Sequence, residues 1–301
     1  MDIGEVLTVS FQKTWKYKLF WLFGALPFVL NAFYMPVSQF VSPFNEVLLP
    51  GFFEPFLSWQ VELVGNLLSL GVLFLSIPLF FFGMLALTTG VVRAENREAR
   101  LLLGELMQDV LRFFWRALGV RAIFFFGTMA ILFPILFMGF FVSAFTMGLG
   151  ALCMFPLFFL FIPVSYTIYA LMEMAEAAVV ADDLSVMDAI SKTWMLVKTN
   201  FLQLFLLAVI VYMGISLVAF IVLPPLLLPV YFPFFSVFIE NVISARDAIL
   251  ISMACLCISM PLYVLFQGVM LALQKTAWTQ AYLALTRKPV QQAPVEVFNV
   301  G

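Results

Sequence analysis

The sequence predicts an all-α integral membrane protein with six transmembrane helices and cytoplasmic interfacial amphipathic helices. Hydrophobic residues make up 64% of the 301 residues, charged residues make up 11%, and the mean hydropathy is +1.10. Soluble domains contain about 45–50% apolar and about 25% charged residues. Six long apolar runs and a one-sided distribution of basic residues predict the same fold class. No linker or low-complexity tract divides the chain, so we expect one membrane domain over residues 1–301.

Six apolar runs are long enough to cross a bilayer core, which takes about 20 helical residues. The expected spans are residues 19–36, 63–91, 121–147, 150–172, 201–228 and 248–274. Gly148 and Gly150 are turn signals that separate the third run from the fourth. The first run follows an amphipathic segment with Asp2 and Glu5 and has no small-residue cleavage site, so we expect it to remain in the mature protein.

The basic residues predict the orientation, because short cytoplasmic loops are enriched in Lys and Arg. With six spans and a cytoplasmic N-terminus, every Lys and Arg except Arg246 falls on the cytoplasmic side. The first outer segment carries Glu46, Glu54 and Glu62 and no basic residue. We therefore expect both termini in the cytoplasm, with residues 286–301 as a C-terminal tail.

Three cytoplasmic segments have apolar residues at helical spacing and are expected to lie on the membrane surface as amphipathic helices. They are residues 3–18, 101–117 and 184–199. The first and third contain the same Lys-Thr-Trp triplet, in QKTWKYK and SKTWMLVK. Trp and Lys are favoured at membrane interfaces, so we expect interfacial anchors at Trp15, Lys18, Trp194 and Lys198.

The repeated triplet predicts a unit of one surface helix and two spans that occurs three times. Internal repeats are common in transporters, but any helix that enters a membrane from the cytoplasm favours Trp and Lys at that point. In the third segment, Asp182 and Asp183 are expected to cap the surface helix, and Asp188 is expected to pair with Lys192 one turn later.

Three stretches of the chain resemble a known group of proteins: GEVLTVSFQKTWKYKLFWLFGAL, AVVADDLSVMDAISKTWMLVKTNFLQLFLL and TAWTQAYLAL. They are similar to poorly characterised bacterial multi-pass membrane proteins akin to the membrane domain of glycerophosphodiester phosphodiesterases. The resemblance implies a six-helix membrane domain with surface helices in the bacterial inner (plasma) membrane and no assigned substrate. The catalytic domain of those phosphodiesterases is not in this sequence, so their reaction is not implied.

The composition argues against catalysis. The chain has no histidine, which is the commonest general base and a common metal ligand. The acidic pairs at 95 and 98 and at 182 and 183 are better explained by a basic loop and a helix cap. Cys153, Cys255 and Cys257 are expected to be buried small apolar side chains. We expect no enzyme activity, no catalytic or cofactor-binding residues, no metal and no nucleic-acid partner.

Ionisable residues within spans are costly and often mark function. Glu173 and Glu176 lie three residues apart at the end of the fourth span, and Lys275 lies at the end of the sixth. They are a possible ion pair at the inner mouth of a pathway. A structural clamp, or snorkelling of the side chains to the interface, explains the same residues.

Prolines occur in every span and are expected to kink the helices. The candidate kinks are Pro27, Pro78, Pro134, Pro163, Pro224, Pro225 and Pro261. The run at 224, 225, 229 and 233 is expected to end a regular helix. Broken helices build substrate sites in transporters, although proline is also tolerated in ordinary membrane helices.

Two functions remain open. The first is a non-catalytic membrane module, an accessory or scaffold subunit that packs against lipids, other membrane-protein subunits or a second copy. The alternative is a permease or lipid-handling transporter with kinked helices. A continuous cavity lined by Asn66, Gln267 and the region of Glu173 would favour transport, whereas closed packing of the spans with apolar contacts to another subunit would favour the module.

Overall fold

The computed structural model describes residues 1–30, 32, 58–95, 103–240 and 244–286, and these residues form only helices and short connections. The elements in chain order are α1 (Ile3–Lys16), a short apolar helix Leu19–Leu30, α3 (Ser58–Glu95), α4 (Leu103–Phe145), α5 (Leu149–Asp182), α6 (Val186–Thr199), α7 (Phe201–Glu240) and α8 (Ala245–Thr286).

Five of these helices are long and apolar enough to cross a membrane. The apolar stretches are Asn66–Glu95, Leu103–Phe145, Phe161–Asp182, Phe201–Pro233 and Leu250–Thr286. The protein is therefore a multi-pass helical membrane protein. The helix Leu19–Leu30 is apolar but shorter, and most of the remainder of the first expected span lies outside the described residues, so a sixth span stays a prediction.

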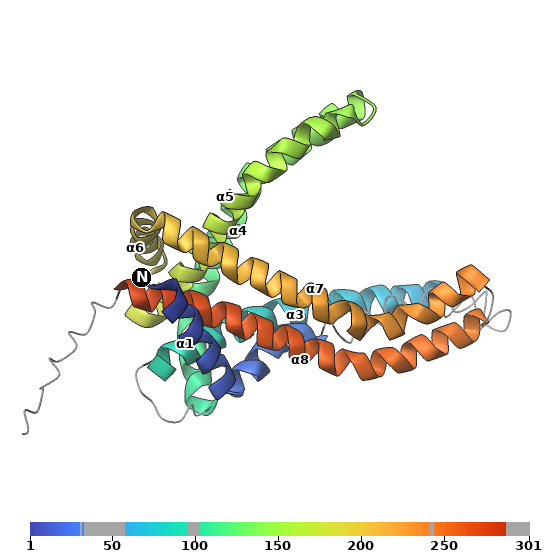
Figure 1. Cartoon of the computed structure of the whole chain (residues 1–301), viewed down its shortest axis with the longest axis horizontal. Helices are drawn as coiled ribbons and strands as arrows, with labels where there is room; N and C mark the ends of the chain where they lie inside the picture. The colour runs from blue at the N-terminus through green and yellow to red at the C-terminus, as the bar shows by residue number, and fades with distance from the viewer. Residues whose placement is uncertain (31, 33–57, 96–102, 241–243, 287–301) are drawn as a thin grey trace, which may run out of the picture.

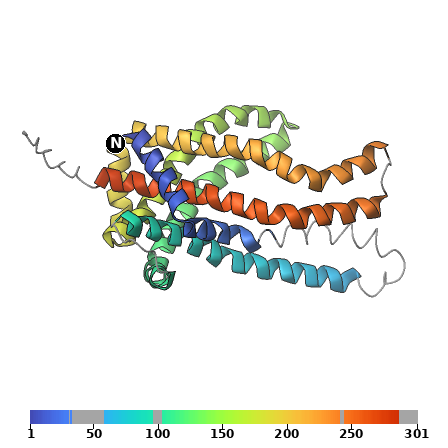
Figure 2. The same cartoon turned by 60° about the horizontal axis from the view of Figure 1, so that its bottom comes forward.

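The long helices form a bundle and a separate hairpin. Helices α3, α7 and α8 run side by side, whereas the outer parts of α4 and α5 leave the bundle together as a hairpin (Figure 1). The short helices α1 and α6 and the carboxyl end of α8 gather at one end of the bundle (Figures 1 and 2). We call this the helix-rich end.

The core lies at the helix-rich end. Buried residues there include the alanine-rich part of α5 from Ala170 to Val180, and Trp278 and Tyr282 of α8. Small residues let helix backbones approach closely in membrane proteins. The apolar residues further along the spans are mostly exposed at the surface of the chain, which is where lipid or another protein lies against a membrane helix.

Glycines hold the helix Leu19–Leu30 between α3 and α8. A Cβ atom at Gly24 would lie 2.1 Å from the carbonyl oxygen of Gly268, and one at Gly83 would lie 2.7 Å from the carbonyl oxygen of Phe23. Neither contact leaves room for a side chain. The first apolar helix is thus packed backbone to backbone against both neighbours.

Helix α4 differs from the prediction of a separate surface helix at 101–117 and a span from 121. Residues Leu103–Phe145 form one continuous helix, because nothing between them removes a backbone hydrogen bond before Pro134. The turn to α5 lies at residues 146–148, where Gly148 has a φ of 94°, at the position that its glycine indicated.

Helix α7 corrects a second expectation. The prolines at 224, 225, 229 and 233 were expected to end the helix, but α7 continues through all four to Glu240. Each interior proline removes one backbone hydrogen bond and bends the helix rather than ending it, and α7 changes direction along its length (Figure 1).

The start of α6 differs from a third expectation, that Asp182 and Asp183 cap this helix. Its N-cap is Ser185, whose hydroxyl accepts a hydrogen bond from the Asp188 backbone N–H. Asp182 is instead the last residue of α5, and Asp183 follows it in the left-handed conformation, with a φ of 52°. Serine is as good an N-cap as aspartate, and Asp182 and Asp183 are engaged in ion pairs.

Candidate functional site

Four charged side chains meet inside the helix-rich end. Glu173 and Glu176 project from one face of α5, Lys275 comes from α8 and Arg121 from α4. Lys275 Nζ lies 2.5 Å from Glu173 Oε2 and 3.0 Å from Glu176 Oε1. Arg121 Nη2 lies 3.3 Å from Glu173 Oε1 and also contacts Glu176 Oε2. We call these four residues the charge cluster.

The charge cluster is buried and electrically balanced. Its two carboxylates and two cations sum to zero, and Glu176 and Lys275 are 0% and 1% exposed. The hydroxyl of Thr88 on α3 donates a further hydrogen bond of 3.1 Å to Glu176 Oε1. Because these side chains do not reach the surface, snorkelling does not account for them. Pairing inside the protein compensates for the desolvation of each charge.

A second polar network lies one turn from the charge cluster. The Gln274 side-chain amide donates hydrogen bonds to the hydroxyls of Tyr169, at 3.0 Å, and Tyr212, at 3.4 Å. The ring of Tyr212 stacks on Tyr166 with centroids 5.1 Å apart. The network joins α5, α7 and α8 through groups that each have a partner.

The lysines of the two Lys-Thr-Trp triplets make equivalent contacts. Lys13 pairs with Glu95 at the end of α3, and Lys192 pairs at 2.7 Å with Asp182 at the end of α5. The expected pair between Lys192 and Asp188 is not formed, because Asp188 accepts a hydrogen bond from Ser185 at the N-cap of its own helix. Each triplet therefore fastens a surface helix to the end of a long helix.

The tryptophans of both triplets face outward. Trp15 and Trp194 are 50% and 56% exposed, while the preceding threonines are buried. Lys18 and Lys198 are exposed as well. Lys18 Nζ lies 3.8 Å from the ring centroid of Trp21 and 5.1 Å from that of Trp15, within the range of a cation–π contact. These placements are compatible with interfacial anchoring, which stays a prediction.

Further ion pairs join the amino-terminal part of α4 to its neighbours. Arg93 of α3 contacts Glu105 at 3.0 Å and Asp109 at 2.6 Å. Arg112 and Arg116 both contact Asp183, each at 2.6 Å. The helix-rich end thus has a buried charge cluster surrounded by more exposed ion pairs.

The remaining predicted residues lie within helices. The structure places Pro27 in Leu19–Leu30, Pro78 in α3, Pro134 in α4, Pro163 in α5, Pro224 and Pro225 in α7 and Pro261 in α8. Cys255 and Cys257 of α8 are free thiols, and the expectation that they are buried is wrong, because Cys255 is half-buried and Cys257 is exposed. The side chain of Cys153 lies outside the described residues. Within the described ranges, no group of three or more His, Cys, Asp or Glu residues is placed to hold a metal ion.

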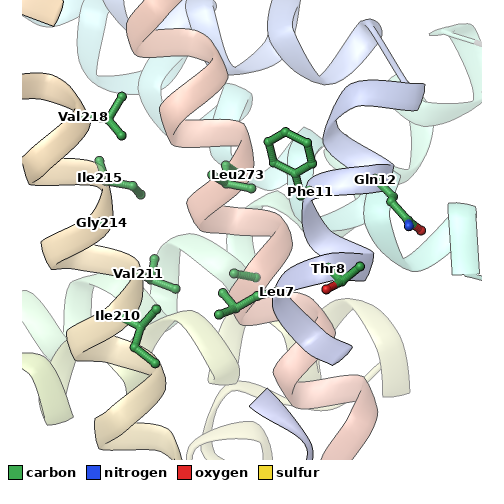
Figure 3. Close-up of a pocket in the computed structure, with 11 residues that line it drawn as sticks. Leu7, Thr8, Phe11, Gln12, Ile210, Val211, Gly214, Ile215, Val218 and Leu273 are labelled. Carbon is green, nitrogen blue, oxygen red and sulfur yellow. The ribbon is translucent and has the colours of Figure 1, made fainter. Parts of the chain in front are cut away.

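Two cavities lie on apolar faces of the protein. One, of about 710 Å³, lies between α1, α7 and α8 (Figure 3). The other, of about 760 Å³, follows α7 past Pro224. Neither of the two is lined by Asn66, Gln267 or a residue of the charge cluster. They are not the polar pathway that the transporter alternative calls for.

The sequence does not by itself indicate the network of Tyr169, Tyr212 and Gln274. It presents Arg121 as one of the positive charges that predict the orientation. The spacing of Arg121 held a signal, because it lies four residues after Ala117 and eight after Phe113, both on the buried face of α4. A cation on the apolar stripe of a helix predicts a buried counter-ion.

No curated protein and no solved structure matches the chain significantly. A family described as "Domain of unknown function (DUF7847)" matches residues 28–285, which include α3 to α7 and all but the last residue of α8. This match gives no support to the phosphodiesterase-related resemblance, which stays a prediction. The chain belongs to the DUF7847 family of multi-pass helical membrane proteins.

Proposed function

We propose that the chain is a non-catalytic membrane module, an accessory or scaffold subunit that packs against other membrane proteins through the α4–α5 hairpin. The hairpin carries this proposal because it leaves the bundle (Figure 1) and the apolar side chains of its α4 arm are exposed. In the most apolar stretch of Leu103–Phe145, only 6% of residues are buried, compared with 56% for Phe161–Asp182 at the base of α5.

The uncovered surface of α4 is rich in phenylalanine. Phe125, Phe133, Phe137 and Phe140 are all exposed. Lipid alone can cover such a surface, but large aromatic side chains also provide the contact area of protein interfaces. A hairpin that stands apart from its own bundle offers the exposed face of α4 to a neighbour.

The charge cluster supports a structural role. Its charges neutralise one another, and its residues come from α4, α5 and α8, which it ties together at the point where the hairpin leaves the bundle. A group that is buried and fully paired needs no substrate to balance its charges. We propose that it fixes the angle of the hairpin, and that the helix-rich end faces the cytoplasm of a bacterial cell.

Photo-crosslinking in native membranes tests this function. A benzophenone amino acid at Phe140 of the hairpin should give a discrete protein adduct at natural expression. The same probe at Phe220, which is similarly exposed on α7, is the matched control and should give lipid adducts only. An adduct of twice the chain mass would identify a second copy as the partner. Equal, diffuse labelling at both positions would refute the proposal.

The alternative is a permease or lipid-handling transporter, and the burial of four charges among three spans favours it. Replacing all four with Arg121→Met, Glu173→Met, Glu176→Met and Lys275→Met separates the two functions. Replacement of a buried ion network by apolar residues is often neutral or stabilising, so a module should fold and keep its crosslinked partner. A transporter should lose a substrate-dependent phenotype while the protein still accumulates in the membrane.

A further inference from the structure

The cavity between α1, α7 and α8 is a groove with three apolar sides. Leu273 of α8 forms its floor, Ile215 and its neighbours on α7 form one wall, and Leu7 and Phe11 of α1 form the other (Figure 3). Its polar lining residues, Thr8 and Gln12, both come from α1. Its volume of about 710 Å³ lies within the range of about 300–1,000 Å³ that is usual for ligand sites.

A glycine keeps the α7 wall open. Gly214 lines the groove, and a Cβ atom built on it would meet no other atom within 4 Å. A large side chain at this position would therefore occupy the groove without displacing the protein's own atoms. The space belongs to the surface of the bundle and not to an imperfectly packed core.

The α1 wall leads directly to a cationic site. The ring of Phe11 stacks on Trp15 with centroids 5.5 Å apart, and Lys18 Nζ lies 5.1 Å from the Trp15 ring. Trp21 is held in place because its indole N–H donates a hydrogen bond of 2.9 Å to the carbonyl of Thr14. Lys18 is exposed, and within the described part of the chain it forms no ion pair with a carboxylate.

We infer that this groove binds an anionic phospholipid, with one acyl chain along Leu273 and Phe11 and the phosphate at Lys18. An amphipathic helix lies at the boundary between headgroups and acyl chains, which places α1 where both parts of a lipid are present. The charge of Lys18 complements a phosphate, and the apolar groove complements an acyl chain. The site is separate from the hairpin and does not depend on the function proposed above.

The second Lys-Thr-Trp triplet provides an internal comparison. Trp194 and Lys198 of α6 are exposed like Trp15 and Lys18. However, neither of the two cavities described above is lined by a residue of α6. If a tryptophan and a lysine were sufficient to retain lipid, both sites would do so. The groove distinguishes α1 from α6.

Native mass spectrometry of the full chain tests the inference. The protein is reconstituted in nanodiscs of phosphatidylglycerol and phosphatidylcholine, transferred to detergent and stripped of lipid in steps. We expect one phosphatidylglycerol per chain to persist after the other lipids have been removed. Gly214→Phe should abolish this retention, whereas Gly127→Phe should not, because Gly127 also has open space around its Cβ position but does not line the groove.

The charge requirement is tested in the same experiment. Lys18→Gln should lower the preference for phosphatidylglycerol over phosphatidylcholine about fivefold, as expected for one lysine near an anionic headgroup. Lys198→Gln should leave the retained lipid unchanged. The inference is overturned if no lipid persists, if Gly214→Phe and Gly127→Phe behave alike, or if the two lipids are retained equally. Lys18→Gln tests the site on its own if Gly214→Phe does not fold.

Discussion

Replacing Glu176 alone should strongly destabilise the protein, because it leaves a buried positive charge without a partner. Glu176 is fully buried and contacts both cations of the charge cluster, Arg121 and Lys275. Glu176→Gln leaves two cations facing only Glu173. Lys275→Met leaves two carboxylates facing only Arg121. Each single substitution therefore buries one uncompensated charge, and the double substitution restores neutrality.

The size of the effect follows from this charge balance. Breaking a buried pair by removing one partner costs about 3–5 kcal/mol. We expect about 3–5 kcal/mol for Glu176→Gln and for Lys275→Met. The double variant keeps the pair of Arg121 and Glu173, so it should cost less than the sum, with a coupling energy of about 2–3 kcal/mol.

The assay is unfolding of the purified protein in mixed micelles of a mild detergent and SDS, which gives the free energy of unfolding for each variant. Arg112→Gln is the control, because Arg112 belongs to an exposed pair and its partner Asp183 keeps Arg116. It should cost less than about 1 kcal/mol. Single substitutions that cost no more than this control, or costs that simply add in the double variant, would refute the reasoning.

Three further predictions concern packing, the surface helices and orientation. Gly24→Leu should lower the free energy of unfolding by about 1–3 kcal/mol or more in the same assay, because the leucine side chain would meet the α8 backbone. The control Gly127→Leu should change it by less than about 0.5 kcal/mol, and equal effects of the two substitutions would contradict this packing. Replacing Trp15 and Trp194 together should change the depth of neighbouring spin labels without preventing insertion, and unchanged depth would count against anchoring. In a background without native cysteines, a cysteine at Ser191 should react with an impermeant thiol reagent only after permeabilisation; reaction in intact cells would reverse the orientation.

Features that depend on one stretch of sequence were predictable. Composition and the length of the apolar runs indicate a multi-pass helical membrane protein, and the structure contains five helices that fit this description. Gly148 indicated the turn of the hairpin because its left-handed φ of 94° favours glycine. The prediction that the prolines end α7 was wrong because each proline removes only its own backbone hydrogen bond. The hydrogen bonds on either side of it continue the helix.

Features that depend on which helices meet were less predictable. The face shared by Glu173 and Glu176 follows from their spacing, and Lys275 was paired with them from its position in the chain. Arg121 shares the apolar stripe of α4 with Phe113 and Ala117, but only the packing of α4 on α5 shows which carboxylates it meets. The predicted partner of Lys192, Asp188, was also wrong, because the end of α5 brings Asp182 into contact with Lys192.

The α4–α5 hairpin stands clear of the bundle (Figure 1), and one distance between spin labels tests this placement. One label replaces Phe140 on α4 and the other Phe220 on α7, and the distance is measured by pulsed electron resonance in lipid nanodiscs. The axes of packed helices lie about 8–10 Å apart and each helix is about 10–12 Å wide, so labels at one depth on two packed helices lie within roughly 20 Å of each other. We predict a single distance distribution well beyond roughly 20 Å. A distribution at or below roughly 20 Å, with the hairpin folded against α7, would contradict this placement.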